Sequence, residues 1–267
     1  MQLAPSDRFY RLVVRTGILA RWLLRLRVEI TGVENLPEEE TRHGYRVVAP
    51  GTGAVVAMNH FGLVDFVFAE LAVFKGNRAH IRFMITRKRA GNLFMQAVVQ
   101  LCDHIVVDRA RGEGALLDGI AKARRGDYVG IFAEGSTNLS FQVRPIKSGA
   151  VRIAATTGVP IIPVSVFGAH RLITRGRKVR LRELWRAPVR VHIGEPFRVS
   201  PDDDVKAASE QLRARLQAGV DLAIDTYQHP LEAGAWWLPT SRGGTAMTPR
   251  QDDQKYAQER AKYDQTG

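Results

Sequence analysis

From residue 45 onward, short runs of β-branched and apolar residues alternate with longer stretches of helical periodicity, and this alternation limits the possible folds most strongly. Strands that alternate with helices form an open sheet covered by helices on both faces. We therefore expect an α/β fold with a mixed, largely parallel sheet flanked by helices. The expected strands are 45–49, 54–58, 81–86, 104–107, 128–132, 160–166 and 189–193, and the expected helices are 62–75, 91–101, 113–125, 147–157 and 203–227.

A first polar break, Asn59-His60, directly follows the apolar strand at 54–58, and Asp65 comes five residues after the histidine. On one continuous helix, five residues would set the two side chains about 140° apart. They can meet only if His60 lies in the turn after the strand and Asp65 in the first turns of the next helix. A histidine held in one tautomer by a carboxylate can act as a general base. A structural or solvated pair is the alternative that this stretch leaves open.

A second polar break lies at 131–138, with the sequence IFAEGSTN, and it also follows a predicted buried strand. Open α/β sheets place their sites at the carboxyl ends of strands. His60 and Glu134 both fall at such ends, so we expect a single site that contains both. Ser136 does not lie in a Gly-x-Ser-x-Gly elbow, which argues against a serine hydrolase.

These two segments resemble blocks of the glycerolipid acyltransferases, the family of 1-acylglycerol-3-phosphate acyltransferases. The first block of that family is Asn-His-x-x-x-x-Asp, and the third is Phe-Pro-Glu-Gly-Thr. Residues 87–109, which end in HIVVDR, resemble the second block, and VPIIPV at 159–164 resembles the fourth. Four blocks in the right order make the resemblance specific.

The resemblance implies transfer of a fatty acyl chain from acyl-CoA or an acyl carrier protein to the hydroxyl of lysophosphatidic acid, giving phosphatidic acid. It implies that His60 is the general base, that Asp65 orients its ring, and that no bound cofactor, metal or covalent acyl-enzyme is needed. The residues that it places at the acceptor are Arg87, Arg109, Glu134, Gly135, Ser136 and Lys147.

Two departures from the third block leave the acceptor open. Ala133 stands where the family has proline, and Asn138 follows Ser136-Thr137 where an arginine is often found. Arg144 or Lys147 could supply the missing charge. Another lysophospholipid or a glycolipid is therefore an alternative acceptor.

The chain has 39 Lys and Arg residues against 27 Asp and Glu residues, which favours a polyanionic partner. An anionic membrane surface and nucleic acid both qualify, and a basic nucleic-acid-binding protein is the competing class. No recognisable nucleic-acid module supports that class, so we expect a membrane partner and no nucleic acid. The basic run at 171–186, interleaved with apolar residues, suits anionic headgroups. The single cysteine, Cys102, excludes an internal disulfide and is expected to be buried.

Residues 1–30 are expected to form a basic amphipathic helix, because arginines recur among aromatic and leucine residues. Such a helix is typical of a membrane interface, although packing on its own domain fits the pattern equally well. The resemblance favours the interface, so we expect a peripheral protein on the cytoplasmic face of the cell membrane. Residues 31–238 would form the acyltransferase domain. The polar tail at 239–267 is expected to be disordered, or to form a loosely attached helix at 250–263.

Overall fold

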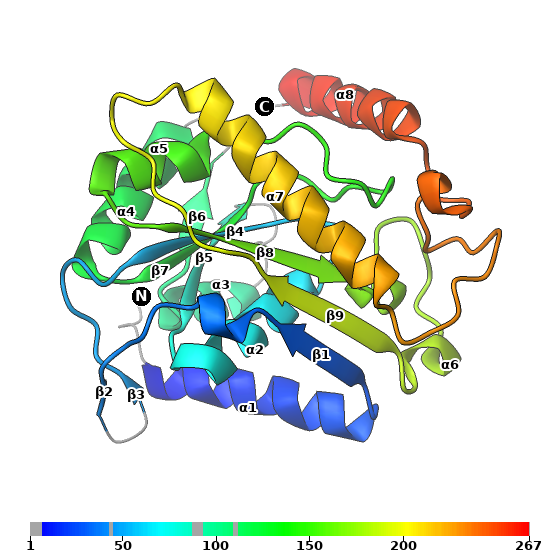
Figure 1. Ribbon diagram of the computed structural model, residues 1–267, viewed down its shortest axis with the longest axis horizontal. Coiled ribbons are helices and arrows are strands. Elements are labelled where there is room, and N and C mark those ends of the chain that lie inside the picture. Colours follow the sequence, from blue (N-terminus) through cyan, green and yellow to red (C-terminus); the bar gives the residue numbers. More distant parts are fainter. Residues whose placement is uncertain (1–6, 43–44, 87–92, 109–111, 267) are drawn as a thin grey trace.

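Seven strands form one sheet in the computed structural model, which describes residues 7–42, 45–86, 93–108 and 112–266. The strand order is β1-β9-β8-β4-β7-β5-β6 (Figure 1). Only the β8–β9 pair in this sheet is antiparallel, so the prediction of a mixed, largely parallel sheet is confirmed. The strands are β1 (Arg27–Thr31), β4 (Ala54–Met58), β5 (Ile81–Thr86), β6 (Ile105–Val107), β7 (Tyr128–Phe132), β8 (Ile161–Phe167) and β9 (Pro188–Ile193).

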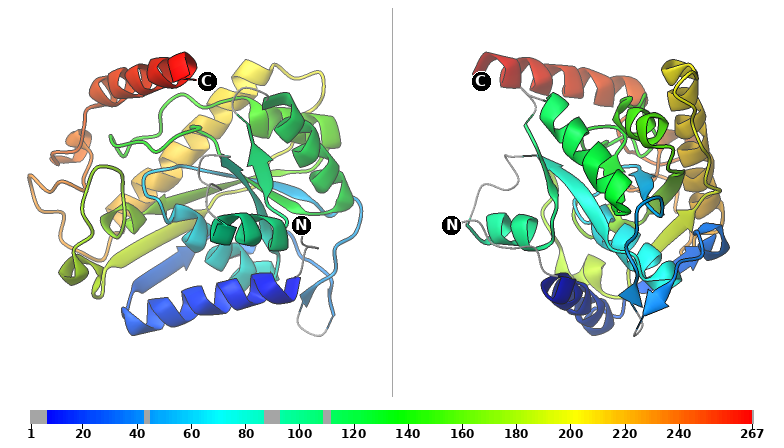
Figure 2. Two further views of the ribbon diagram at one scale, coloured as in Figure 1. Left: turned by 180° about the vertical axis from the view of Figure 1, so that it is seen from behind. Right: turned by 90° about the vertical axis from the view of Figure 1, so that its left-hand side faces the viewer.

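Helices cover both faces of the sheet (Figures 1 and 2). They are α1 (Asp7–Leu23), α2 (Asp65–Asn77), α3 (Leu93–Leu101), α4 (Gly112–Arg125), α5 (Gly149–Thr157), α6 (Leu181–Leu184), α7 (Val205–Asp225) and α8 (Pro249–Thr266). One apolar core joins the sheet to α4, α5 and α7, and a second joins it to α2. Helix α1 packs outside α2 and α3 through a smaller cluster. None of the helices in the described ranges is long and apolar enough to cross a lipid bilayer.

The central strand β4 explains why the Ala54–Met58 run is wholly apolar. Val55 and Ala57 point into the first core, whereas Val56 and Met58 point into the second. A strand covered by helices on both faces has no solvent face, so its sequence does not alternate. The carboxyl end of this strand is therefore fixed from both sides, and the residues that follow it are held in place.

The N-terminal helix is shorter than expected. Helix α1 ends at Leu23, Arg25 takes a left-handed conformation (φ 50°), and residues 27–31 form the edge strand β1, paired in parallel with β9. Val28 and Ile30 alternate with polar residues in this strand, which is the two-residue period of a half-buried strand. The expectation of a helix throughout 1–30 is therefore wrong for residues 27–30. The alternation of basic and apolar residues continues from the helix into the strand, so the two-residue period of the strand was not recognised.

The strand expected at 45–49 is reduced to β3 (Tyr45–Arg46), which pairs with β2 (Thr41–Arg42) in a separate two-stranded hairpin.

The C-terminal tail also differs from its first expectation, because residues 239–266 are not disordered. A short 3₁₀ turn (Thr240–Arg242) leads to α8, so the alternative of a C-terminal helix is the one that the structure has. That helix is attached by polar contacts, which a search for apolar residues could not find. Cys102 is buried, as expected, and burial raises the pKa of its thiol to about 12.

Candidate active site

The two polar breaks meet because their strands are neighbours. Strands β4 and β7 pair in parallel with Met58 opposite Phe132, so the turns that follow them leave the same edge of the sheet. His60 and Glu134 each lie two residues beyond a strand end. The backbone N–H of His60 donates to Oε1 of Glu134 at 2.9 Å. The expected convergence of the two segments is thus present in the structure.

Asp65 lies at the start of α2, and its carboxylate faces the His60 ring. Nδ1 of His60 lies 3.5 Å from Oδ2 of Asp65, and both side chains are buried. The same oxygen accepts the backbone N–H groups of Phe61 (2.8 Å) and Gly62 (2.7 Å). Burial raises the pKa of the Asp65 carboxyl, and His60 and these two amides oppose that rise. A carboxylate fixed by two amides holds the imidazole in one orientation, with Nδ1 toward Asp65.

The other ring nitrogen of His60 faces a hydroxyl group. Nε2 lies 3.2 Å from Oγ1 of Thr137, which is buried, and the imidazole stacks on the Phe132 ring at a centroid distance of 3.9 Å. With its proton on Nδ1, toward Asp65, the imidazole accepts a hydrogen bond at Nε2. An alcohol oxygen therefore fits within hydrogen-bonding distance of the nitrogen that would act as the base.

Glu134 is buried and accepts hydrogen bonds from both polar turns of the site. Besides the His60 amide, it accepts from Nδ2 of Asn138 (2.5 Å) and the backbone N–H of Arg144 (3.3 Å), and the Arg144 Nε lies 3.4 Å from Oε2. Burial raises the pKa of the Glu134 carboxyl to about 7, against the opposing effect of these donors. In this structure the carboxylate ties the second turn to the first. Its expected contact with an acceptor stays a prediction.

Gly135 and Lys147 lie against each other. Gly135 has φ 73°, and a Cβ atom there would come within 2.7 Å of Cε of Lys147, whose exposed side chain crosses the turn. The Ser136 hydroxyl is buried and makes no hydrogen bond within the described part of the chain, so no base activates it there. Arg87 and Arg109 lie outside the described residues.

Several residues of the site had no predicted role. The Asn59 side chain bonds both backbone groups of Val166, so it extends the pairing of β4 with β8 to the position beside His60. Thr137 and Asn138 contact the histidine, and both belong to the IFAEGSTN run at 131–138. Arg144, considered as a replacement phosphate ligand, is instead buried against Glu134. Within the described ranges, no group of three or more His, Cys, Asp or Glu side chains is arranged to hold a metal ion.

Comparison with known proteins relates this site to a family. The family described as Acyltransferase matches residues 27–167. Relatives named 1-acyl-sn-glycerol-3-phosphate acyltransferase include those of Cocos nucifera (27% identical over 197 residues, 72% of this chain and 56% of the relative) and Bacillus subtilis (28% over 146 residues, 54% and 65%). A third, from Borreliella burgdorferi, is 23% identical over 163 residues, 59% of this chain and 58% of the relative. The chain thus spans less than two thirds of the length of these relatives.

The fold has a solved counterpart. The crystal structure of the 1-acyl-sn-glycerophosphate acyltransferase PlsC from Thermotoga maritima superposes with a TM-score of 0.63 at 22% identity, covering 82% of this chain and 81% of that one. The family match covers more than half of the chain and includes both turns of the site. The chain belongs to the acyltransferase family.

Proposed function

We propose that this protein transfers a fatty acyl chain from an acyl thioester to the free hydroxyl of lysophosphatidic acid, giving phosphatidic acid. The observation that carries the proposal is the His60 ring, held between the Asp65 carboxylate and the Thr137 hydroxyl. The activity for which these relatives are named supports this acceptor. Another lysophospholipid or a glycolipid is the second candidate, because the third block lacks the usual proline and arginine.

In the proposed reaction, Nε2 of His60 removes the proton from the attacking hydroxyl. The oxygen then adds to the thioester carbonyl, which gives a tetrahedral intermediate. When the carbon–sulfur bond breaks, the imidazolium gives its proton to the departing thiolate. Because the acceptor oxygen attacks the thioester directly, no covalent acyl-enzyme forms. Asp65 stabilises the imidazolium during this cycle. A positioned general base of this kind contributes about 10²–10⁴-fold to the rate. The Thr137 hydroxyl, 3.2 Å from Nε2, shows that an alcohol oxygen fits beside this nitrogen.

The acceptor phosphate needs cations. Lys147 is the candidate on this turn, because its exposed side chain crosses Gly135, whereas Arg144 is buried and paired with carboxylates. Arg87 and Arg109 remain predicted partners of the same phosphate. Acyl-CoA and an acyl carrier protein are both retained as donors.

We further propose that α1 attaches the protein peripherally to the cytoplasmic face of the cell membrane. One face of α1 packs on the domain through Tyr10, whose hydroxyl donates to the carbonyl of Ile81 at 2.6 Å. Other faces of the helix expose large apolar side chains, of which Trp22 is 72% exposed. Packing on the domain and binding to a membrane are therefore compatible, because each would use a different face of the helix.

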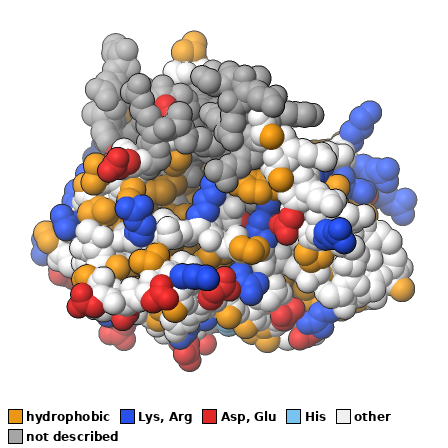
Figure 3. All heavy atoms as spheres, turned by 90° about the horizontal axis from the view of Figure 1, so that it is seen from above, with side chains coloured by type: hydrophobic (Ala, Val, Ile, Leu, Met, Phe, Trp, Pro, Cys, Tyr) orange, Lys and Arg blue, Asp and Glu red, His pale blue; other side chains and the backbone are white. Residues whose placement is uncertain are grey.

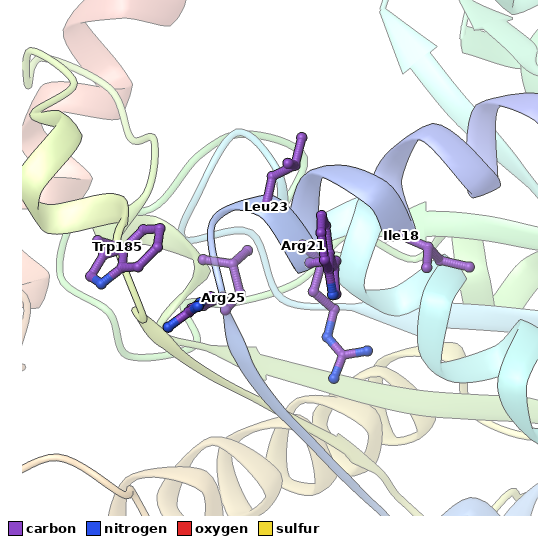
Figure 4. Close-up of a pocket in the computed structure, with 7 residues that line it drawn as sticks. Ile18, Arg21, Leu23, Arg25 and Trp185 are labelled. Atoms are coloured by element: carbon purple, nitrogen blue, oxygen red, sulfur yellow. The ribbon is translucent and has the colours of Figure 1, made fainter.

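A groove of about 530 Å³ joins α1 to the end of α6 (Figure 4). Its lining residues are Ile18, Arg21, Trp22, Leu23, Arg25, Leu26 and Trp185. The Arg25 guanidinium lies 5.3 Å from the centre of the Trp185 ring, in a cation–π contact. Interfacial tryptophans together with arginines are suited to an anionic bilayer, where each basic residue contributes about 1 kcal/mol.

The nucleic-acid alternative rests on charge alone. On the face seen in Figure 3, acidic and basic side chains are intermixed over much of the described surface, and Lys and Arg side chains gather at one edge of it. Such a group of cations fits an anionic lipid surface as well as a nucleic acid. The match to the acyltransferase family therefore gives priority to the lipid substrate.

The assay that tests the proposal follows transfer from radiolabelled palmitoyl-CoA to lysophosphatidic acid, with phosphatidic acid as the product. Formation of phosphatidic acid by the wild-type protein is the expected result. If no phosphatidic acid forms, but a product forms with another lysophospholipid, a glycolipid or an acyl carrier protein donor, the reaction class stands and the proposed substrates are replaced. No product with any of these pairs overturns the proposal.

A further inference from the structure

Helix α8 contacts the catalytic turn through a buried carboxylate. Asp252 is 3% exposed, and it is the one buried residue among those of α8 whose side chains the structure describes. The rest of this helix is strongly polar. Figure 1 shows α8 beside the loop that leads from β7 to α5. A buried acid in an otherwise exposed polar helix needs partners, because an unpaired buried charge is costly.

Two consecutive backbone amides connect that acid to the histidine. The N–H of Asn138 donates to the carbonyl of His60 at 2.7 Å, and the N–H of Leu139 donates to Oδ1 of Asp252 at 2.9 Å. Thr137, whose hydroxyl faces Nε2 of His60, directly precedes this pair. The loop is therefore fixed to the catalytic histidine on one side and to α8 on the other.

Arg144 makes a second connection to the same acid. Its Nη2 lies 3.2 Å from Oδ2 of Asp252 and donates to the carbonyl of Thr137 at 3.0 Å, while its Nε lies 3.4 Å from Glu134. The guanidinium also lies over the Tyr256 ring, 4.8 Å from its centre. A buried cation between two carboxylates is destabilised when either partner is removed.

The far end of α8 reaches the first turn. Glu259 forms a two-pronged ion pair with Arg175, at 2.7 and 2.8 Å. The neighbouring Thr174 donates its hydroxyl hydrogen to the carbonyl of Phe61 at 2.8 Å, next to His60. Helix α8 thus bridges the two chain segments that flank the histidine.

We propose that Asp252 is a positioning residue for acyl transfer, which acts through Leu139 and Arg144 to hold Thr137 and Asn138 against His60. It touches no reacting atom. The inference rests on the proposed function for its kinetic test. The expected signature is a fall in kcat without a change in substrate affinity, because the side chain orients the base and does not contact the acceptor.

The kinetic test compares Asp252→Ala with Asp253→Ala, the adjacent exposed acid on the same helix. Asp252→Ala removes the acceptor of the Leu139 amide and one carboxylate of Arg144. A misplacement of about 1 Å can cost about 10²-fold in rate, so we expect kcat to fall at least about tenfold, with KM for both substrates within about twofold. Asp253→Ala should keep wild-type kcat. Asp252→Asn keeps an oxygen for Leu139 but loses the charge, so its kcat should be intermediate.

A second readout does not need acyl transfer. Hydrogen exchange at the Leu139 amide should be faster in Asp252→Ala than in wild type and unchanged in Asp253→Ala. If wild type transfers no acyl chain, the proposed function fails while the exchange test still decides the connection to α8. Unchanged exchange, or wild-type kcat in Asp252→Ala, overturns the inference. If Asp252→Ala does not fold, a folded Asp252→Asn with wild-type kcat overturns it as well.

Discussion

The backbone N–H of His60 donates to the side chain of Glu134 at 2.9 Å, and this bond joins the two turns of the site across neighbouring parallel strands. The histidine is therefore fixed at three points: its amide by Glu134, its carbonyl by Asn138, and its ring between Asp65 and Phe132. A side chain held at both backbone groups and at its ring loses little further freedom when substrate binds. Such preorganisation is what a general base requires.

Replacing the base or its orienting carboxylate should remove most of the activity. We expect His60→Ala and Asp65→Asn each to lower kcat for acyl transfer by at least about 10²-fold, because proton removal and stabilisation of the imidazolium are lost. His229→Ala, which changes a partly buried histidine on the chain after α7, is the matched control and should remain active. Full activity of His60→Ala on any acceptor would show that the base has been wrongly assigned.

The sequence predicted that the two polar turns would meet, because both directly follow buried parallel strands. The AVVAM and YVGIF runs marked strands buried on both faces, and the polar residues after them had to lie at one edge of the sheet. The Asn-His-x-x-x-x-Asp spacing then required a turn between His60 and Asp65, as the structure has. Local sequence patterns were therefore sufficient to predict that these two turns meet.

The supporting contacts could not be found in the same way. Arg144 carries a charge that fits a phosphate equally well in the sequence, and only the fold places it between Glu134 and Asp252. Asp252 lies 113 residues from Leu139, in a tail whose composition suggests disorder. Polar contacts between distant segments leave no periodicity, so neither hydrophobic spacing nor the family blocks could predict them.

The buried Glu134 should make stability depend on pH. Its pKa in the folded protein is raised to about 7, above the ordinary value of 4.5, so the folded state binds the proton more tightly than the unfolded state. The contribution of Glu134 to the free energy of unfolding is therefore largest below about pH 4.5 and falls as the pH rises to about 7, with a slope of up to about 1.4 kcal/mol per pH unit. Above that range the contribution is level.

Chemical denaturation of wild type and Glu134→Gln across this pH range measures the effect. Because Asp65 and Asp252 also have raised pKa values, the difference between the two proteins, rather than either curve, isolates Glu134. We expect the unfolding free energy of Glu134→Gln relative to wild type to rise from pH 4.5 to 7. A difference that stays constant with pH would contradict the raised pKa.

Alanine substitution at two glycines with nearly the same backbone conformation can distinguish backbone strain from a steric clash with Lys147. Gly135 and Gly158 have φ 73° and 72°, but a Cβ atom meets Lys147 only at Gly135, and finds nothing within 4 Å at Gly158. A left-handed alanine costs about 1–2 kcal/mol, so thermal unfolding should show a loss of stability in both alanine variants. Only Gly135→Ala should displace Lys147 and so raise KM for lysophosphatidic acid. Equal KM values in the two variants would remove Lys147 from the proposed phosphate site.

Membrane attachment should depend on the groove between α1 and α6. We expect Trp22→Ala and Trp185→Ala each to weaken co-sedimentation with vesicles that contain anionic phospholipid, because each removes an aromatic ring of this groove, 72% and 51% exposed respectively. Raising the salt concentration should weaken binding of the wild type, since the arginines act through screened charge. Leu222→Ala, which alters an exposed apolar residue on α7, should bind like wild type.

Equal binding of wild type and both tryptophan variants would place the membrane contact on another surface. Equal binding of wild type to neutral and anionic vesicles would show that the arginines do not contribute through charge.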